Sequence, residues 1–277
     1  MILHCGSRTL DLRRPQIMGI LNVTPDSFSD GGQFVDPAKA IQHAAAMMTD
    51  GATVIDVGGE STRPGASPVT TEEELARVIP AVEGITAQLD VTVSVDTSNP
   101  VVIREAALAG AHMINDVRAL QREGALTAAA ATGLPVCLMH MQGSPESMQK
   151  HPCYDDVIQE VRRFLIERAD AARNAGIDAS QILLDPGFGF GKNHVHNYTL
   201  LNRLDQIGSL GYPLLTGLSR KRMIAEVLPD GADRDPASAT AAALCAMKGA
   251  RILRVHNVKA TSDAISVLTA MMEEGHE

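Results

Sequence analysis

A short apolar run that follows a glycine recurs along the chain. Each run comes after a stretch with helical spacing and ends at a polar residue. Glycine just past a helix is a common C-terminal cap, and unbroken apolar runs suit strands buried on both faces of a parallel sheet. The glycines concerned are Gly51, Gly110, Gly133, Gly176, Gly211 and Gly249. The pattern predicts alternating helices and parallel strands.

Eight strands are expected, each followed by a helix. Their expected ranges are 17–22, 53–58, 92–96, 112–116, 135–140, 181–185, 213–218 and 251–256. Eight such units are the count of an α/β protein with a (β/α)8 TIM barrel. Residues 1–16 have no preceding helix, so we expect them to form a short N-terminal hairpin across the bottom of a barrel that spans 17–274. No linker or low-complexity tract interrupts the sequence, which predicts one domain over 1–277.

Several helix starts can be read directly. Asp36, Asn99 and Asp235 each precede a proline, which predicts a capping side chain before a first-turn proline. Thr71 opens the run TEEE, which predicts a capping box. The segment 154–176 carries apolar residues at helical spacing, which indicates a core-facing helix.

Composition narrows the functional classes. The net charge of −9 over 277 residues gives no general attraction for nucleic acid or membrane surfaces, so an anionic ligand would need local basic residues. The four cysteines form no CxxC pair and no zinc spacing, which favours reduced, partly buried thiols. The N-terminus lacks the apolar core of a signal peptide, and no apolar window is long enough to span a bilayer. We expect a soluble cytoplasmic protein.

The predicted strands all end in polar residues, at the face where barrel enzymes place their chemistry. These residues are Asn22, Asp56, Asp96, Asn115, His140, Asp185, Ser219 and His256. Any one of them could simply cap a helix or satisfy loop amides, but caps alone do not explain eight.

The signs of the charges at this face suggest the ligand. Acidic and amide side chains suit a heterocycle with several N–H donors. The basic group of Arg63, Lys221, Arg254 and His256 suits phosphate or carboxylate. One ligand with both features would be a nitrogen heterocycle that bears a phosphate ester.

Three glycine-containing loops follow these strands. The segments VTPDSFSDGGQF and VGGESTRPGASPV lack an apolar pattern and are expected to be long loops able to cover the barrel mouth. The run LLDPGFGFGKN fits neither a Walker loop nor a dinucleotide fingerprint. Its glycines indicate only that backbone lies close to another group.

Eight segments together resemble the dihydropteroate synthase family of folate biosynthesis, in that family's order, from residue 17 to about 257. They read MGILNVTPDSFSDGG, IDVGGESTRPGA, SVDTSNP, INDV, LMHMQG, LLDPGFGFGK, GLSRKRMI and RVHNV. The resemblance implies a transferase that condenses 6-hydroxymethyl-7,8-dihydropterin diphosphate with 4-aminobenzoate to give 7,8-dihydropteroate and diphosphate. It also implies a homodimer and a sulfonamide target.

The resemblance carries residue roles with it. The pterin would be bound by Asp96, Asn115, Met139, Asp185, Lys221 and Arg254, with Ile20 and Val117 as further apolar walls. The diphosphate would be bound by Asn22, Thr62, Arg63, Arg254 and His256, and Mg²⁺, the one implied cofactor, by Asn22. The aminobenzoate would contact Phe28, Pro64, Phe190, Ser219 and Arg220. The catalytic set would be Asp30, Arg63, Lys221, Arg254 and His256.

Two details complete these expectations. Ser219 is expected to open the helix after the seventh strand, so that backbone amides there hold the aminobenzoate carboxylate. Lys192 is expected to be a surface charge.

The chemistry is consistent with this site. An aryl amine is neutral at pH 7 and needs no strong base, whereas the departing diphosphate needs charge neutralisation. The electron-rich pterin can carry positive charge at its exocyclic carbon, which favours a dissociative displacement.

Three alternatives stay open at this point. A methyltetrahydrofolate–corrinoid methyltransferase would share the pterin pocket but would not need the SRK run or the two loops. A catalytically silent paralogue would be expected to have lost loop or phosphate residues, and none is lost. A generic phosphosugar barrel is the third.

Overall fold

The computed structural model describes residues 1–24, 36–60, 69–143, 148 and 151–274. Eight parallel strands close into a barrel in the order β10-β3-β4-β5-β6-β7-β8-β9. The strands are β3 (Gln16–Asn22), β4 (Val54–Gly58), β5 (Thr92–Asp96), β6 (Met113–Asp116), β7 (Val136–Met139), β8 (Ile182–Asp185), β9 (Leu214–Thr216) and β10 (Ala250–Val255). Every boundary lies within two residues of the expected one, and the predicted TIM barrel is confirmed.

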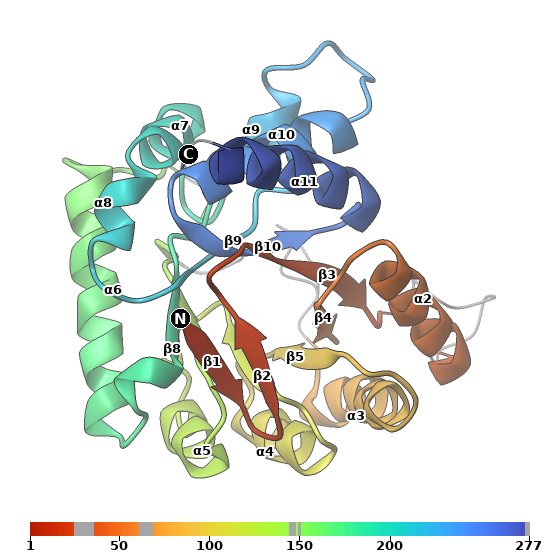
Figure 1. Ribbon diagram of the computed structural model, residues 1–277. Helices are drawn as coiled ribbons and strands as arrows, with labels where there is room; N and C mark the ends of the chain where they lie inside the picture. Colours follow the sequence, from red (N-terminus) through yellow and green to blue (C-terminus); the bar gives the residue numbers. More distant parts are fainter. Residues whose placement is uncertain (25–35, 61–68, 144–147, 149–150, 275–277) are drawn as a thin grey trace.

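Helices surround the barrel (Figure 1). They are α2 (Pro37–Thr49), α3 (Thr71–Gln88), α4 (Pro100–Leu108), α5 (Ala125–Thr132), α6 (Val157–Asn174), η1 (Ala179–Gln181), α7 (His194–Asn202), α8 (Leu204–Gly208), α9 (Arg222–Ala225), α10 (Asp235–Met247) and α11 (Val258–Glu274). At least one helix follows each barrel strand, as the sequence pattern predicts. The six glycines that precede the strands all have positive φ, from 67° at Gly133 to 111° at Gly51, so they serve as left-handed ends of the preceding segments.

The N-terminal hairpin closes the lower end of the barrel. Strands β1 (Ile2–Cys5) and β2 (Arg8–Asp11) pair antiparallel, and Figure 1 shows them lying across the barrel opening. Their inward residues form one apolar cluster with side chains of the barrel interior. The cluster contains Leu3, Cys5, Leu10, Leu12, Met18, Val54, Met113, Cys137, Leu183, Leu215 and Ile252. The predicted hairpin is therefore confirmed, and it seals a dry lower layer.

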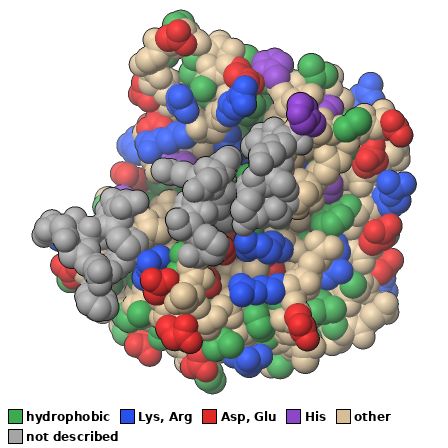
Figure 2. All heavy atoms as spheres, turned by 180° about the vertical axis from the view of Figure 1, so that it is seen from behind, with side chains coloured by type: hydrophobic (Ala, Val, Ile, Leu, Met, Phe, Trp, Pro, Cys, Tyr) green, Lys and Arg blue, Asp and Glu red, His purple; other side chains and the backbone are tan. Residues whose placement is uncertain are grey.

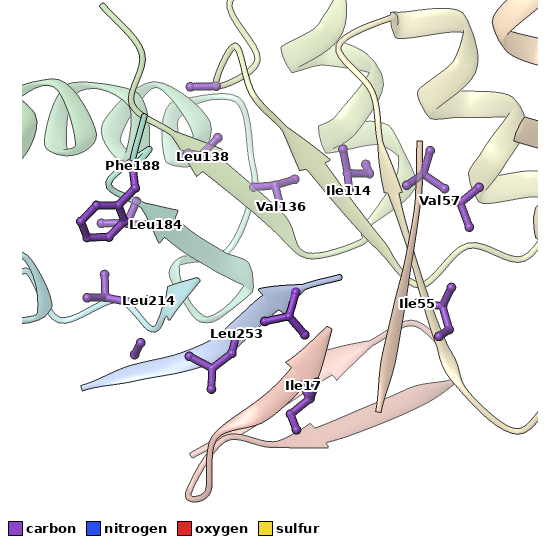
Figure 3. Packing of buried hydrophobic residues seen from close by; sticks show 14 of the residues in the cluster. Ile17, Ile55, Val57, Ile114, Val136, Leu138, Leu184, Phe188, Leu214 and Leu253 are labelled. Atoms are coloured by element: carbon purple, nitrogen blue, oxygen red, sulfur yellow. The ribbon is translucent and has the colours of Figure 1, made fainter. Parts of the chain in front are cut away.

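The outward residues of the same strands pack against the helices. Figure 3 labels several of these side chains, including Ile55, Ile114, Leu184 and Leu253, which alternate with the inward residues. A strand turns successive side chains to opposite faces, so a wholly apolar run supplies both the inner and the outer core. This explains why the strands show no polar alternation along their lower halves.

Two of the four predicted helix caps are confirmed and two are wrong. The side chains of Asp36 and Asn99 accept from the backbone N–H groups of Ala38 and Val101, as expected. The expected capping box at Thr71 is wrong by one residue, because Thr70 caps α3 and exchanges hydrogen bonds with Glu73. The cap expected at Asp235 is also wrong.

Asp235 is the first residue of α10 rather than its cap. Its carboxylate accepts from the side chains of Arg220 and Asn257, so it is engaged outside the helix end.

The helices and the cysteines bear on two further expectations. Within the described ranges, no helix combines the length and apolar character needed to cross a membrane. The cysteines are reduced, with Cys5, Cys137 and Cys245 buried and Cys153 exposed, as the sequence predicts.

Candidate active site at the carboxyl ends of the strands

Charged side chains replace apolar ones in the upper half of the barrel interior. Strands β4, β8 and β10 place Val54, Leu183 and Ile252 in the lower apolar cluster. Two residues later the same strands present Asp56, Asp185 and Arg254. The period-2 geometry of a strand turns both positions of each pair inward. The strand ends therefore build a polar layer directly above a dry one.

Arg254 of β10 bridges to two strands, β4 and β5, that are not its direct neighbours in the barrel. Its Nε donates to Oδ2 of Asp56 at 2.6 Å, and its Nη2 donates to Oδ2 of Asp96 at 2.8 Å. Asn115 donates its side-chain N–H to the same Asp56 oxygen at 3.1 Å. The other Asp56 oxygen, Oδ1, is buried with no hydrogen-bond partner among the described residues. One carboxylate thus fixes both a guanidinium and an amide.

Burial and neighbouring charges shift the pKa values of Asp96 and Arg254. Burial raises the pKa of Asp96 to about 7, with Arg254 opposing the shift and Asp56 adding to it. Burial acts to lower the pKa of Arg254, but the carboxylates of Asp56 and Asp96 outweigh it and raise that pKa. Arg254 therefore stays charged, and Asp96 titrates near neutral pH.

Asp185 and Lys221 form a second limb of the site. Oδ1 of Asp185 accepts the backbone N–H of Gly187 at 2.7 Å, while burial raises the pKa of Asp185 and Lys221 opposes that rise. Lys221 donates to the carbonyl of Phe188, and its Nζ lies 4.2 Å from the centre of the Phe190 ring. Burial lowers the pKa of Lys221 to about 8, against the attraction of Asp185. Phe190 is held by a cation–π contact beside the acid–base pair.

The expectation that Lys192 is a surface charge is wrong. Its residue is 2% exposed, and its ammonium donates to the carbonyls of Gly187 at 2.8 Å and Phe190 at 3.1 Å. It also lies 2.9 Å from Nδ1 of His140. The glycines fold the 187–191 loop back on itself, so the lysine that ends the motif turns inward instead of outward.

Ser219 does not open a helix, contrary to expectation. The following helix, α9, begins at Arg222 and has four residues, so it offers no extended helix N-terminus to a carboxylate. The Ser219 hydroxyl instead accepts the backbone N–H of His256 at 3.1 Å and lies 3.0 Å from Nδ1 of that histidine. Ser219 and His256 are therefore joined, although they belong to different predicted substrate subsites.

Arg220 has a left-handed backbone, with φ of 59°. Its guanidinium pairs with both oxygens of Asp235, at 2.6 and 2.7 Å. This contact, more than any other, holds the pKa of Asp235 down at about 2. The pair places Arg220 at the rim of the site next to the Ser219–His256 contact.

Asn22 lies beside Asp96 across Gly58. A Cβ on Gly58 would sit 3.8 Å from both Oδ1 of Asn22 and Oδ2 of Asp96. Among the described residues, no group of three His, Cys, Asp or Glu side chains could hold a metal ion by itself. Oxygen ligands of this kind suit Mg²⁺, which is commonly held by one or two protein oxygens together with substrate phosphates. The side-chain oxygen of Asn22 is a ligand of the kind that fits a Mg²⁺ ion held mainly by substrate phosphates.

The remaining predicted residues divide into two groups. Met139, Ile20 and Val117 are buried at or next to the strand ends. Phe28, Asp30, Thr62, Arg63 and Pro64 lie outside the described residues.

Two residues of the site have contacts that the sequence does not predict. Asp56 is recognisable as one of the acidic strand ends expected to face a ligand, and its period-2 relation to Val54 places it inside the barrel. The sequence does not predict its contacts with Asn115 and Arg254. No local signal distinguishes Lys192 from an exposed lysine, because its partners come from the folded loop and from the end of β7.

Seen from the side opposite the hairpin, Lys and Arg side chains gather near the middle of the face (Figure 2).

Comparison with known proteins identifies the family. Residues 18–256 match the model of the pterin binding enzymes. The chain is 56% identical to dihydropteroate synthase of Escherichia coli (strain K12) over 273 residues, which cover 98% of this chain and 97% of that protein.

Solved structures agree. The Yersinia pestis dihydropteroate synthase with a sulfonamide drug complex has a TM-score of 0.93 and 52% identity, covering 99% of this chain and 100% of that one. The Xanthomonas albilineans enzyme with 4-aminobenzoic acid has a TM-score of 0.91 at 51% identity, and its complex with 7,8-dihydropteroate has 0.88 at 48%. These two cover 98% of this chain, and 98% and 99% of theirs. The chain therefore belongs to the pterin binding enzyme family and, within it, to the dihydropteroate synthases.

Proposed function

We propose that this chain joins 6-hydroxymethyl-7,8-dihydropterin diphosphate to 4-aminobenzoate, releasing diphosphate, through the charged upper layer of its barrel. The observation that carries the proposal is the meeting of Asp96, Asn115 and Arg254 around Asp56, with Asp185 and Lys221 as the second limb. Acidic and amide acceptors for a pterin thus share one site with cations for a phosphate. Relatives whose structures contain 7,8-dihydropteroate or 4-aminobenzoic acid support the same substrates.

The pterin is bound by hydrogen-bond acceptors whose orientation is fixed by other contacts of the site. Because Asn115 donates its N–H to Asp56, its carbonyl oxygen is left to accept an N–H from the ligand. The second oxygen of Asp185 serves the amino and ring N–H groups, and Lys221 donates to the pterin carbonyl. The buried Met139 supplies an apolar wall.

Diphosphate departure is assisted by cations at the rim. The guanidinium of Arg254 uses Nε and Nη2 on carboxylates and keeps further N–H donors for an incoming anion. His256 follows the end of the same strand, next to Ser219. The side chain of Asn22 would hold Mg²⁺, which when bound would neutralise charge on the phosphate oxygens.

The second substrate is placed by aromatic and polar groups. Phe190, fixed over Lys221, gives a face for the aminobenzoate ring. Ser219 and Arg220 lie at the rim as candidates for its carboxylate. Thr62, Arg63 and Asp30, with Phe28 and Pro64, complete the proposed set from the two loops.

The displacement is proposed to be dissociative. The bond between the exocyclic carbon and the bridging oxygen breaks first, the pterin carries the positive charge, and the neutral amine then attacks and releases a proton. Substrate labelled with ¹⁸O at the bridging position should therefore scramble label into non-bridging positions. The test adds an unreactive aminobenzoate analogue. Label that stays in place throughout would favour direct displacement.

Incubation of the protein with pterin diphosphate and labelled aminobenzoate tests the overall proposal. A labelled dihydropteroate product is expected. Methyl transfer from methyltetrahydrofolate to a corrinoid would instead favour the methyltransferase reading. Tight pterin binding with no product would favour a silent paralogue.

Assembly, location and drug response belong to the same proposal. We propose a homodimer that uses α10 and α11, two helices that contact each other and carry the exposed apolar residues Leu244, Met247, Val267 and Met271. Met247→Lys should then shift the sedimentation coefficient toward that of a monomer. We further propose a cytoplasmic location, no nucleic-acid or membrane partner, and inhibition by sulfonamides, as for the Yersinia pestis relative.

A further inference from the structure

A buried ammonium lies beneath the site with neutral acceptors around it. Each hydrogen bond described for Nζ of Lys192 ends on an uncharged group, namely His140 or the carbonyls of Gly187 and Phe190. Burial lowers the pKa of Lys192 well below its ordinary value, even though Asp185 acts in the opposite direction. Burying a charge without a close counter-ion is costly. A methyl-ended side chain would fill the same space without that cost, so the donors themselves need an explanation.

The acceptors all belong to two backbone segments that touch. A Cβ on Gly187 would lie 1.9 Å from the carbonyl oxygen of His140, and one on Gly191 would lie 2.4 Å from that of Gln142. Both glycines have positive φ. The 187–191 loop is therefore pressed against the end of β7. Lys192 binds the carbonyls of Gly187 and Phe190 within this loop and also contacts the His140 ring.

His140 is suited to receive the ammonium. Nδ1 of His140 lies 2.9 Å from the Lys192 nitrogen and accepts one of its N–H groups when the ring carries its proton on Nε2. Burial first, and then Lys192, lower the pKa of His140 to about 2, which agrees with a neutral ring. The His140 backbone N–H also donates to the carbonyl of Asp185 at 2.9 Å.

The same short loop supplies three contacts of the Asp185–Lys221 limb. The N–H of Gly187 binds Asp185, the carbonyl of Phe188 binds Lys221, and the Phe190 ring lies under Lys221. Lys192 holds the carbonyls of residues 187 and 190, at the two ends of this set. A shift of the loop would therefore move three groups that set the position of Asp185, Lys221 and the ring wall.

We infer that Lys192 is a positioning residue for aminobenzoate binding, acting through the 187–190 backbone rather than by contact with substrate. The inference rests on the proposed synthase function, because it assigns Phe190 to the second substrate. Supporting groups that lock the orientation of site residues typically have this arrangement of buried donors and loop carbonyls.

Lys192→Met and Lys192→Gln test the inference, because both side chains have similar length and only the amide retains donors. Lys192→Met should raise the KM for 4-aminobenzoate about tenfold, the effect of losing buried hydrogen bonds, while kcat changes much less. Lys192→Gln should recover a substantial part of that loss. Lys248→Met is the matched control, since Lys248 also donates to a backbone carbonyl, that of Asn202, but before β10 begins.

The possible outcomes are separable. A wild-type chain that makes no product defeats the proposed function itself. An active wild type with an unchanged KM in folded Lys192→Met, or equal defects in the Met and Gln variants, overturns the inference. If neither variant folds, His140→Leu removes one acceptor of the same contact. A raised aminobenzoate KM then supports the inference, and an unchanged KM overturns it.

Discussion

The lower and upper layers of the barrel interior are made by the same strands, two residues apart. Val54 lies below Asp56, Leu183 below Asp185, and Ile252 below Arg254. The lower side chains form a dry cluster that the hairpin covers. The upper ones include buried carboxylates that pair with the guanidinium of Arg254.

The two layers differ in what a substitution can do. Apolar contacts are non-directional, so removing one leaves a cavity but no new charge. A buried ion pair is directional, and removing one member leaves the other unpaired in a low-dielectric site. The lower layer should therefore respond mainly through stability, whereas the upper layer should respond through both stability and ligand binding.

Arg254→Met should give the largest effect. It leaves Asp56 and Asp96 without their cation, so the free energy of unfolding should fall by about 3–5 kcal/mol, and turnover should be lost. Chemical denaturation checks the first part, with Ile252→Val as the control on the same strand, expected to cost about 0.5–1.5 kcal/mol. Equal stability of Arg254→Met and the wild type would show that the carboxylates do not need this partner.

Leu183→Ala should destabilise nearly as much but leave the chemistry intact. Leu183 is fully buried in the lower cluster, and such a truncation costs about 2–5 kcal/mol. We expect kcat/KM close to the wild-type value at temperatures where the variant is folded. A large loss of activity in the folded variant would mean that the lower layer also positions Asp185.

Asp185→Asn is the converse of Leu183→Ala on the same strand. An amide can match only part of the donor fork that a carboxylate accepts, so affinity for a pterin analogue should fall by about 1.5–3 kcal/mol. The melting temperature should change little. Isothermal calorimetry measures the affinity, and unchanged binding would remove Asp185 from the pterin site.

Asp96 should give a smaller, pH-dependent effect. Its pKa is raised from 3.8 to about 7, so the folded chain binds this proton more tightly than the unfolded chain does. The associated stability is present below about pH 4 and is lost as the pH rises through 7. The free energy of unfolding should therefore fall over this window in the wild type and fall less in Asp96→Asn. If the free energy of unfolding fell equally with pH in the wild type and in Asp96→Asn, Asp96 would not be the group that titrates in this window.

The amino-acid pattern locates part of the site. It predicts the polar residues that close the strands, including Asp96, Asn115 and Asp185, at the barrel mouth, and the structure has them there. It does not predict their partners. The pattern does not predict that Asp56 holds Asn115 and Arg254, and it assigns Lys192 to the surface, yet both residues are buried with several hydrogen bonds.

The features that the sequence predicts depend on residues close together in the chain, whereas the contacts that it misses depend on residues far apart in the chain. Strand ends and glycine caps depend on a few neighbouring residues, so the predicted boundaries are right within two positions. Even a local device can shift by a residue, as at Thr70, when two adjacent threonines can both cap. The cap expected at Asp235 fails because a distant arginine, Arg220, takes the carboxylate.

The sequence by itself determined the eightfold alternation of strands and helices, the hairpin, and the face on which the polar residues gather. These follow from hydrophobic periodicity and from glycine and proline geometry, which act over one turn or one strand. Only the tertiary structure decided which charges are neighbours. Arg254 meets Asp56 across 198 residues of sequence, because closure of the barrel places β10 beside β3, one strand from β4, and turns both side chains into one interior.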